Sequence, residues 1–304
     1  MSGSSDVNEL RILHLSDTHL FGDDRLHYGK VDTTAALDAM LARCTSLCDL
    51  DLIVVSGDCS DDGSADSYRK LAERVEPLAQ RHRAPVIYAM GNHDDRAGFA
   101  AVLGNGHPGS QAAGDAPIDG VSTVRGWRVI TLDTSVPGGA AYGMLRPAQL
   151  DWLKDLLATN EGHGTIVLMH HPPVNAQASL LRTMQLQNPA ALAEVIGDSD
   201  VRMILAGHFH HQLASDLDGI PVVVAPGIAN CTDPTTDPSV NRTIRASGAN
   251  LIEIGVASHH AYDFYVADPR FGETLNELDG SQIASIAEAL GSPDWRARLD
   301  ELNL

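Results

Sequence analysis

The feature that most constrains the fold is a series of short apolar runs that alternate with amphipathic segments along most of the chain. A strand with one wet face alternates apolar and polar residues, whereas several of these runs contain three or more consecutive apolar residues, so both of their faces should be covered. The intervening segments carry apolar residues at the helical period, as at Leu150, Leu153 and Leu157. Strands covered by helices define an α/β architecture. The predicted strands are 11–17, 52–58, 85–92, 127–134, 165–171, 201–208 and 220–227, and the predicted helices are 33–47, 65–81, 146–158 and 189–197.

The pattern changes in the last quarter of the chain. Residues 250–268 are predicted to form a hairpin with a solvated turn at His259 and His260, and two short helical segments follow, separated by Gly-Ser-Pro. We therefore expect a disordered N-terminus over 1–10, a main domain over 11–268 and a helical extension over 269–304. Two long segments without predicted structure, 104–120 and 226–248, are candidates for holding part of a ligand.

Side chains that can bind metal ions follow five of the apolar runs. The carboxyl ends of strands in α/β sheets meet where ligands bind, so these side chains should lie together. Imidazole and carboxylate donors without thiolates suit ions such as Zn, Mn, Fe or Co. Seven donors exceed the three protein ligands of a typical catalytic zinc, and two ions sharing one carboxylate would receive four each. The seven are Asp17, His19, Asp58, Asn92, His170, His208 and His210.

In their order along the chain, the motifs D-x-H, G-D, G-N-H-D, a strand-end His and G-H-x-H resemble the calcineurin-like metallophosphoesterase superfamily over residues 12–210. Their context, LSDTHL, GDCSDDG and GNHDDR, is similar to the bacterial class III cyclic-nucleotide phosphodiesterases. The resemblance implies that 11–268 is a metallophosphoesterase domain. It also implies an α/β fold of four αββα layers, in which two mixed β-sheets are flanked by helices, with a small C-terminal hairpin and helical extension.

The resemblance assigns a role to each motif residue. Asp58 would bridge two transition-metal ions (Fe, Mn or Zn), and Asn92 and His93 would contact the substrate phosphate. His93 would also protonate the leaving group. One ion would be held by Asp17, His19 and His210, and the other by Asn92, His170 and His208.

The expected activity is hydrolysis of 3′,5′-cyclic nucleotides, cAMP first, to 5′-nucleoside monophosphates by attack of a hydroxide that bridges the two ions. Two alternatives stay open. One is a broad-specificity small-molecule phosphodiesterase or phosphatase of the same superfamily, and the other is a non-catalytic scaffold that binds proteins.

Several neighbouring residues have predicted supporting roles. Asp94, or a backbone carbonyl, is expected to fix the tautomer of His93. Asp133 is expected either to orient the site or to serve only a turn, and His171 to support the ligands. His211, just past the last motif, is expected to be solvated.

Charge and composition limit the partners. A formal net charge of −19, from 40 acidic and 21 basic residues, argues against a nucleic-acid partner. A small anionic substrate is still compatible, because screening weakens the diffuse field of the protein beyond about 8 Å. No apolar stretch approaches roughly 20 residues, and the first residues lack a secretory signal pattern, so we expect no membrane contact and a cytoplasmic location. A homodimer is expected because the C-terminal region carries apolar residues, such as Phe264 and Leu290, beyond what the sandwich needs.

Overall fold

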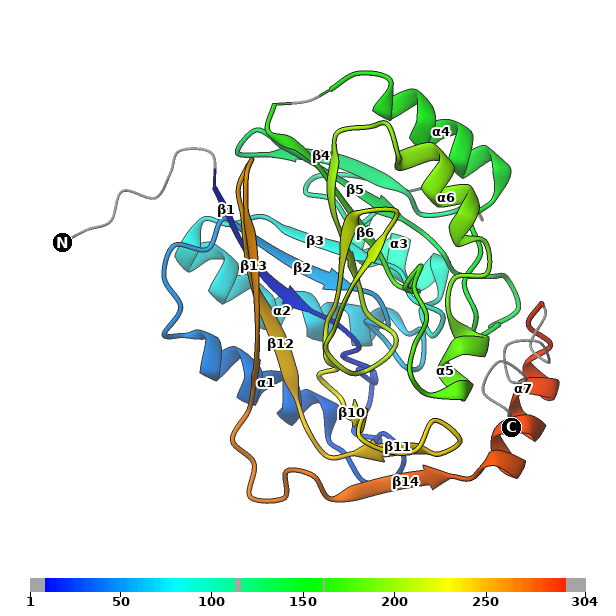
Figure 1. The fold of residues 1–304 in the computed structure, drawn as a ribbon. Helices are drawn as coiled ribbons and strands as arrows, with labels where there is room; N and C mark the ends of the chain where they lie inside the picture. The colour runs from blue at the N-terminus through cyan, green and yellow to red at the C-terminus, as the bar shows by residue number, and fades with distance from the viewer. Residues whose placement is uncertain (1–8, 113–115, 161, 294–304) are drawn as a thin grey trace.

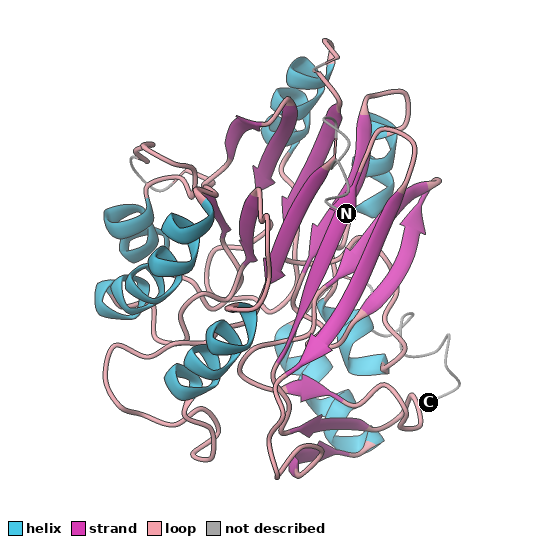
Figure 2. Cartoon of the chain, turned by 90° about the vertical axis from the view of Figure 1, so that its left-hand side faces the viewer, coloured by secondary structure: helices cyan, strands magenta, loops and turns pink. Residues whose placement is uncertain are grey.

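The computed structural model describes residues 9–112, 116–160 and 162–293. Two large mixed sheets lie face to face, and helices pack on both outer faces (Figure 1). The same layers are seen from the side in Figure 2. The predicted four-layer αββα fold is confirmed.

The first sheet has five strands in the order β13-β12-β1-β2-β3. β1 to β3 run parallel, and β12 and β13 form the predicted hairpin, which pairs with β1. The hairpin is thus an edge of the main sheet and not an extension, and its two histidines lie exposed on β13 instead of in the turn. The strands are β1 (Leu10–Leu15), β2 (Leu52–Ser56), β3 (Val86–Ala89), β12 (Gly248–Ile254) and β13 (His259–Tyr265), and the helices outside them are α1 (Thr33–Cys44), α2 (Ala65–His82) and α3 (Arg96–Leu103).

The second sheet has six strands in the order β4-β5-β6-β7-β9-β8. β5, β6, β7 and β9 run parallel, and β4 and β8 close the edges as antiparallel strands. The strands are β4 (Gly120–Val124), β5 (Trp127–Leu132), β6 (Gly164–Met169), β7 (Val201–Ala206), β8 (Leu213–Leu217) and β9 (Ile220–Val224), and the helices that follow or cover them are α4 (Pro147–Leu157), α5 (Ser179–Met184) and α6 (Pro189–Ile196).

β2 shows why the apolar runs are continuous. All five of its residues are buried. Leu52 and Val54 point into the layer between the sheets, while Ile53 and Val55 point toward the helices of the first sheet. Because successive side chains of a strand face opposite sides, a strand in the middle of the sandwich needs apolar residues at every position.

A third, three-stranded sheet lies beyond one end of the sandwich, in the order β10-β11-β14 (Figure 1). Segment 226–248, predicted to lack structure, supplies two of its strands. These two are β10 (Cys231–Thr232) and β11 (Asn241–Ile244). The third strand, β14 (Thr274–Leu278), comes from the C-terminal region.

Helix α7 (Gly280–Leu290) follows β14 and begins with a capping box, in which Asp279 and Gln282 exchange side-chain and backbone hydrogen bonds. It matches the first of the two predicted C-terminal helices. The second lies outside the described residues, as does most of the predicted disordered N-terminus. The boundaries 1–10, 11–268 and 269–304 stay predictions. Within the described ranges, every helix is too short or too polar to cross a bilayer.

Candidate metal centre

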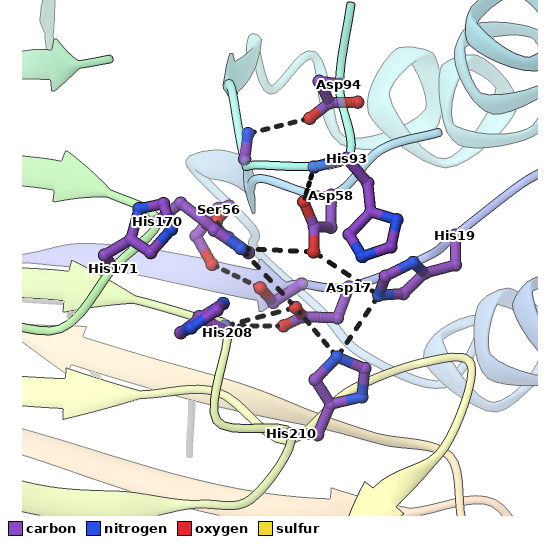
Figure 3. A network of polar contacts seen from close by, with 12 residues as sticks. Asp17, His19, Ser56, Asp58, His93, Asp94, His170, His171, His208 and His210 are labelled. Carbon is purple, nitrogen blue, oxygen red and sulfur yellow. Dashed lines mark hydrogen bonds and ion pairs between the residues drawn. The ribbon is translucent and has the colours of Figure 1, made fainter. Parts of the chain in front are cut away.

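The polar residues that follow β1, β2, β3, β6 and β7 converge at one edge of the sandwich (Figure 3). The chain turns sharply after each strand, and five of these residues adopt a left-handed backbone that non-glycine residues seldom take. Their φ values are 54° at Asp17, 43° at His19, 46° at Asp58, 68° at His208 and 54° at His210.

Glycine is required beside these turns because the strands approach closely. A Cβ atom at Gly91 would collide with the Asp58 carboxylate, and one at Gly57 would collide with the His170 ring. Gly57 also has a φ of 100°, which side chains disfavour. The Gly-Asp and Gly-Asn-His-Asp motifs therefore have a steric origin as well as a chemical one.

Imidazole nitrogens and carboxylate oxygens approach one another at the spacing of ligands around an ion. His210 Nε2 lies 3.2 Å from both Asp17 Oδ1 and His19 Nε2. Asp58 Oδ2 lies 3.3 Å from His170 Nε2 and 3.5 Å from His19 Nε2. Two ligands at ~2.0 Å from a tetrahedral ion are separated by about 3.3 Å. Asp58 thus stands between the two groups of donors, where a bridging carboxylate would lie.

Hydrogen bonds fix the tautomer of three of the histidines. In each, Nδ1 faces an oxygen that can only accept, so Nδ1 carries a proton and, when the ring is neutral, the lone pair is on Nε2. This is the state that a metal ligand requires. The Nδ1 atoms of His19, His170 and His210 donate to Asp61 Oδ1 at 2.9 Å, the Ser56 carbonyl at 2.8 Å and the oxygens of Asn230 at 3.0 and 3.1 Å.

Several buried side-chain atoms at the centre that could bind an ion lack a hydrogen-bond partner among the described residues. They include Asn92 Oδ1 and His208 Nε2. An unpaired buried polar atom costs about 1–3 kcal/mol, which an ion bound there would offset. His171 lies against His208, with ring centroids 4.5 Å apart. The residues present fit a metal centre, and His171 stands as close to it as the motif residues do.

The electrostatics of the site also favour cations. Burial lowers the pKa of His93, but the nearby Asp58 and Asp61 carboxylates outweigh it and raise that pKa to about 9. His170 behaves in the same way beside Asp58, with a pKa also of about 9. Burial instead lowers the pKa of His208 to about 3, so this ring is neutral and its lone pair is available. Buried carboxylates that attract protons onto neighbouring rings attract metal ions for the same reason.

His93 lies at the rim of the centre, with 43% of its side chain exposed. Its ring packs edge-on against His19, with centroids 4.8 Å apart, and its backbone N–H donates to Asp58 Oδ1 at 2.9 Å. Its Nδ1 lies 3.3 Å from Asp61 Oδ1. Nε2, on the far side of the ring from Nδ1, is therefore directed away from Asp61.

The prediction that Asp94 or a backbone carbonyl fixes His93 was wrong. Asp94 accepts backbone N–H bonds from Cys59, Ser60 and Gly91 at 2.8–3.1 Å, which holds together the turns after β2 and β3. The carboxylate at His93 is that of Asp61.

Asp61 is the functional residue that sequence reasoning missed. One of its oxygens, Oδ1, contacts the Nδ1 atoms of three histidines: His19 at 2.9 Å, His93 at 3.3 Å and His27 at 3.4 Å. Its only sequence signal is an acidic residue three positions after Asp58 in GDCSDDG.

Two other neighbours differ in outcome. Asp133 is fully buried and accepts from Arg96 Nε at 2.9 Å and Ile118 N at 3.0 Å, so it organises loops beside the site by hydrogen bonding. His211 was expected to be solvated, but it is 6% exposed, stacks on Phe209 and donates from Nδ1 to that residue's carbonyl. The apolar Phe209 ring and this local acceptor explain its burial.

A cavity of about 320 Å³ opens over the centre. Its floor includes His19, Asp58, Asn92 and His208. Of the two candidate ligand-holding segments, 226–248 contributes to its walls, whereas none of the described residues of 104–120 does.

Comparison with known proteins agrees with this geometry. Residues 10–212 match the family described as calcineurin-like phosphoesterase. The chain belongs to this family. The matched segment spans all five strand ends, and the sequence-based recognition of the superfamily is confirmed.

Two curated relatives of this phosphoesterase carry names that specify a substrate. A cAMP/cGMP dual specificity phosphodiesterase of Mycobacterium tuberculosis is 41% identical over 245 residues, covering 80% of this chain and 75% of the relative. The 3′,5′-cyclic adenosine monophosphate phosphodiesterase CpdA of Escherichia coli is 32% identical over 219 residues, covering 71% and 75%.

Among solved structures, a dimetal phosphatase from Danio rerio aligns with a TM-score of 0.55 at 15% identity, over 85% of this chain and 99% of that one. This likeness concerns the fold alone.

Proposed function

We propose that this phosphoesterase hydrolyses 3′,5′-cyclic nucleotides, with cAMP as the principal substrate, at a centre that holds two transition-metal ions. The observation that supports this most strongly is the pair of donor groups that meet at Asp58. The names of the two curated relatives favour a cyclic nucleotide as the substrate.

The donors divide between two ions. Asp58 lies between both groups, within 3.5 Å of His19 Nε2 and 3.3 Å of His170 Nε2, and serves as the shared ligand. The proposed ligands of one ion are Asp17, His19 and His210, and those of the other are Asn92, His170 and His208.

When bound, the two ions would supply Lewis acidity to the phosphate and an activated water as nucleophile. The protein's own groups do the rest. The backbone N–H groups of His93 and His208 donate to the carboxylates of Asp58 and Asp17, which fixes the orientation of both ligands. His93 Nε2, the ring nitrogen that faces away from Asp61, protonates the departing ribose oxygen. Asp61 holds the opposite nitrogen of that ring.

The test is a substrate panel on purified protein loaded separately with Fe, Mn or Zn. We expect hydrolysis of cAMP to 5′-AMP, with two metals per chain by elemental analysis. Bis-p-nitrophenyl phosphate serves as a nucleoside-free control. Turnover of the control with none of cAMP or cGMP would favour a broad-specificity phosphodiesterase, and one metal per chain at full activity would contradict the two-ion assignment.

A further inference from the structure

One wall of the cavity away from the metal centre is lined by residues outside the matched segment 10–212. The small sheet β10-β11-β14 turns one face toward it. Thr232 pairs with Thr243, which pairs in turn with Asn276. Asn241 pairs with Leu278, two positions along the same two strands. Because side chains two residues apart on a strand point to the same side, Asn241 and Leu278 share that face. All five side chains line the cavity.

A second wall is apolar. It is formed by Leu180, Leu181 and Met184 on α5. Of these residues, Leu180 also packs against Ile283 and Ala287 of α7, both fully buried. The C-terminal helix, which lies beside α5 in Figure 1, therefore supports this wall. Strand β14 of the same region contributes Asn276 and Leu278 to the polar wall.

The chemistry of the two walls limits what they can hold. No lysine or arginine is among the described residues that line the cavity. Away from the centre, the lining offers neutral amides and hydroxyls on one side and aliphatic side chains on the other. A volume of about 320 Å³ falls within the usual range for small-molecule sites. These properties suit an uncharged, flat group with a hydrogen-bonding edge.

Asn241 provides the second, independent indication of a ligand. It is 7% exposed, and its Oδ1 has no hydrogen-bond partner among the described residues. An unpaired buried amide oxygen is costly, and a donor on a ligand would satisfy it. A carboxamide carries a donor and an acceptor side by side, the pairing that matches adenine N7 and N6. Asn276, exposed at the mouth, offers the same groups.

We propose that these two walls form the nucleoside subsite of the enzyme, where Asn241 and Asn276 hydrogen-bond the adenine and ribose while the α5 side chains and Leu278 contact the base. The inference rests on the proposed function, since the phosphate must lie at the metal centre. It adds the residues that recognise the uncharged part of the substrate.

The test compares two ligands that share a phosphate. Calorimetric titration of the metal-loaded protein with 5′-AMP and with inorganic phosphate separates nucleoside contacts from metal contacts. Asn241→Ala should weaken 5′-AMP binding about 10-fold or more and change phosphate binding by less than about 2-fold. Asn276→Ala should weaken 5′-AMP binding about 3-fold or more, with the same selectivity, because its exposed hydrogen bond competes with water.

Matched controls come from the same two strands. Arg242 and Glu277 pair across the other face of the sheet, with Nε 2.6 Å from Oε2. Arg242→Ala and Glu277→Ala remove side chains of the neighbouring positions without touching the cavity. Both should bind 5′-AMP as the unmodified protein does.

Unchanged 5′-AMP binding in the two asparagine variants would overturn the subsite, and so would equal losses for 5′-AMP and phosphate. If Asn241→Ala fails to fold, as judged by thermal unfolding, binding of 5′-AMP by the Asn276→Ala variant still tests the subsite, because Asn276 is exposed. Failure of the proposed function would be seen in a different measurement: the unmodified protein would hydrolyse bis-p-nitrophenyl phosphate but not cAMP.

Discussion

Replacing Asp61 by alanine should damage both metal binding and turnover, although Asp61 is not a proposed metal ligand. Its Oδ1 accepts from His19 Nδ1 at 2.9 Å and contacts His93 Nδ1 at 3.3 Å. The first contact orients the ring of a proposed metal ligand, and the second orients the proposed proton donor. One substitution therefore removes two separate supports.

The magnitude follows from these contacts. A hydrogen bond to a charged group contributes about 1.5–3 kcal/mol, and 1.4 kcal/mol is about a factor of ten. Loss of the His19 contact should weaken metal binding about 10- to 100-fold, as expected for partners of ligand histidines. At saturating metal, the freed His93 ring should still lower kcat by about 10-fold or more. Asp61→Asn keeps an acceptor oxygen and should lie between alanine and the unmodified protein.

The assay is a metal titration with elemental analysis, followed by kcat on cAMP at saturating metal. Asp62→Ala is the matched control, because Asp62 accepts from Gly22 N and Ser64 N and contacts no described histidine. If Asp61→Ala binds metal as tightly as Asp62→Ala and turns over within about 3-fold of it, the positioning role of Asp61 is refuted.

Three further predictions concern single residues. Asp58→Ala should abolish activity and lower bound metal more than any other ligand change, because Asp58 contacts both donor groups; two metals per chain with normal turnover would exclude the bridge. His93→Ala should keep both metals and lose about 10²-fold or more on cAMP, whose ribose oxygen leaves poorly, but much less on bis-p-nitrophenyl phosphate; equal losses would exclude a proton donor. Burial lowers the pKa of His107 from 6.5 to about 4, so the folded state disfavours its protonation. Its contribution to stability, at most about 3 kcal/mol, is present above pH 6.5 and lost as the pH falls toward 4. Urea unfolding of His107→Gln should show less loss over that range than the unmodified protein, and parallel curves would contradict the assignment.

The sandwich and the strand-end donors were predictable because both follow from strong local signals. A continuous apolar strand must be covered on both faces, and a parallel sheet brings its carboxyl ends to one edge. The position of a polar residue directly after each strand therefore predicted that these side chains lie close together. They are Asp17, Asp58, Asn92, His170 and His208.

Weaker signals account for the elements that were missed. β8 is an edge strand with an exposed middle, so it carries no apolar run. β10 and β11 are two and four residues long, below the length at which a pattern is readable. α3 and α5 are also short, with eight and six residues.

Contacts between distant segments could not be predicted from the sequence for a different reason. Asp61 and Asp94 are both acidic residues near motifs, and only the folded turns decide which one reaches His93. The same is true of Asn241 and Asn276, which share a face because two short strands pair in a particular register. No motif spacing encodes that register.

The left-handed turns at the strand ends have a consequence for how this protein can change. Each such residue costs on the order of 1 kcal/mol relative to a relaxed backbone, and five of them surround the same few ångströms. Glycine at Asp17 or His210 would relieve that strain and remove a buried charge or ring. Directed evolution for heat resistance alone should therefore substitute these residues first and yield variants that are more stable but inactive. Activity and durability compete here at the same residues, so any thermostabilising screen must select for turnover at the same time.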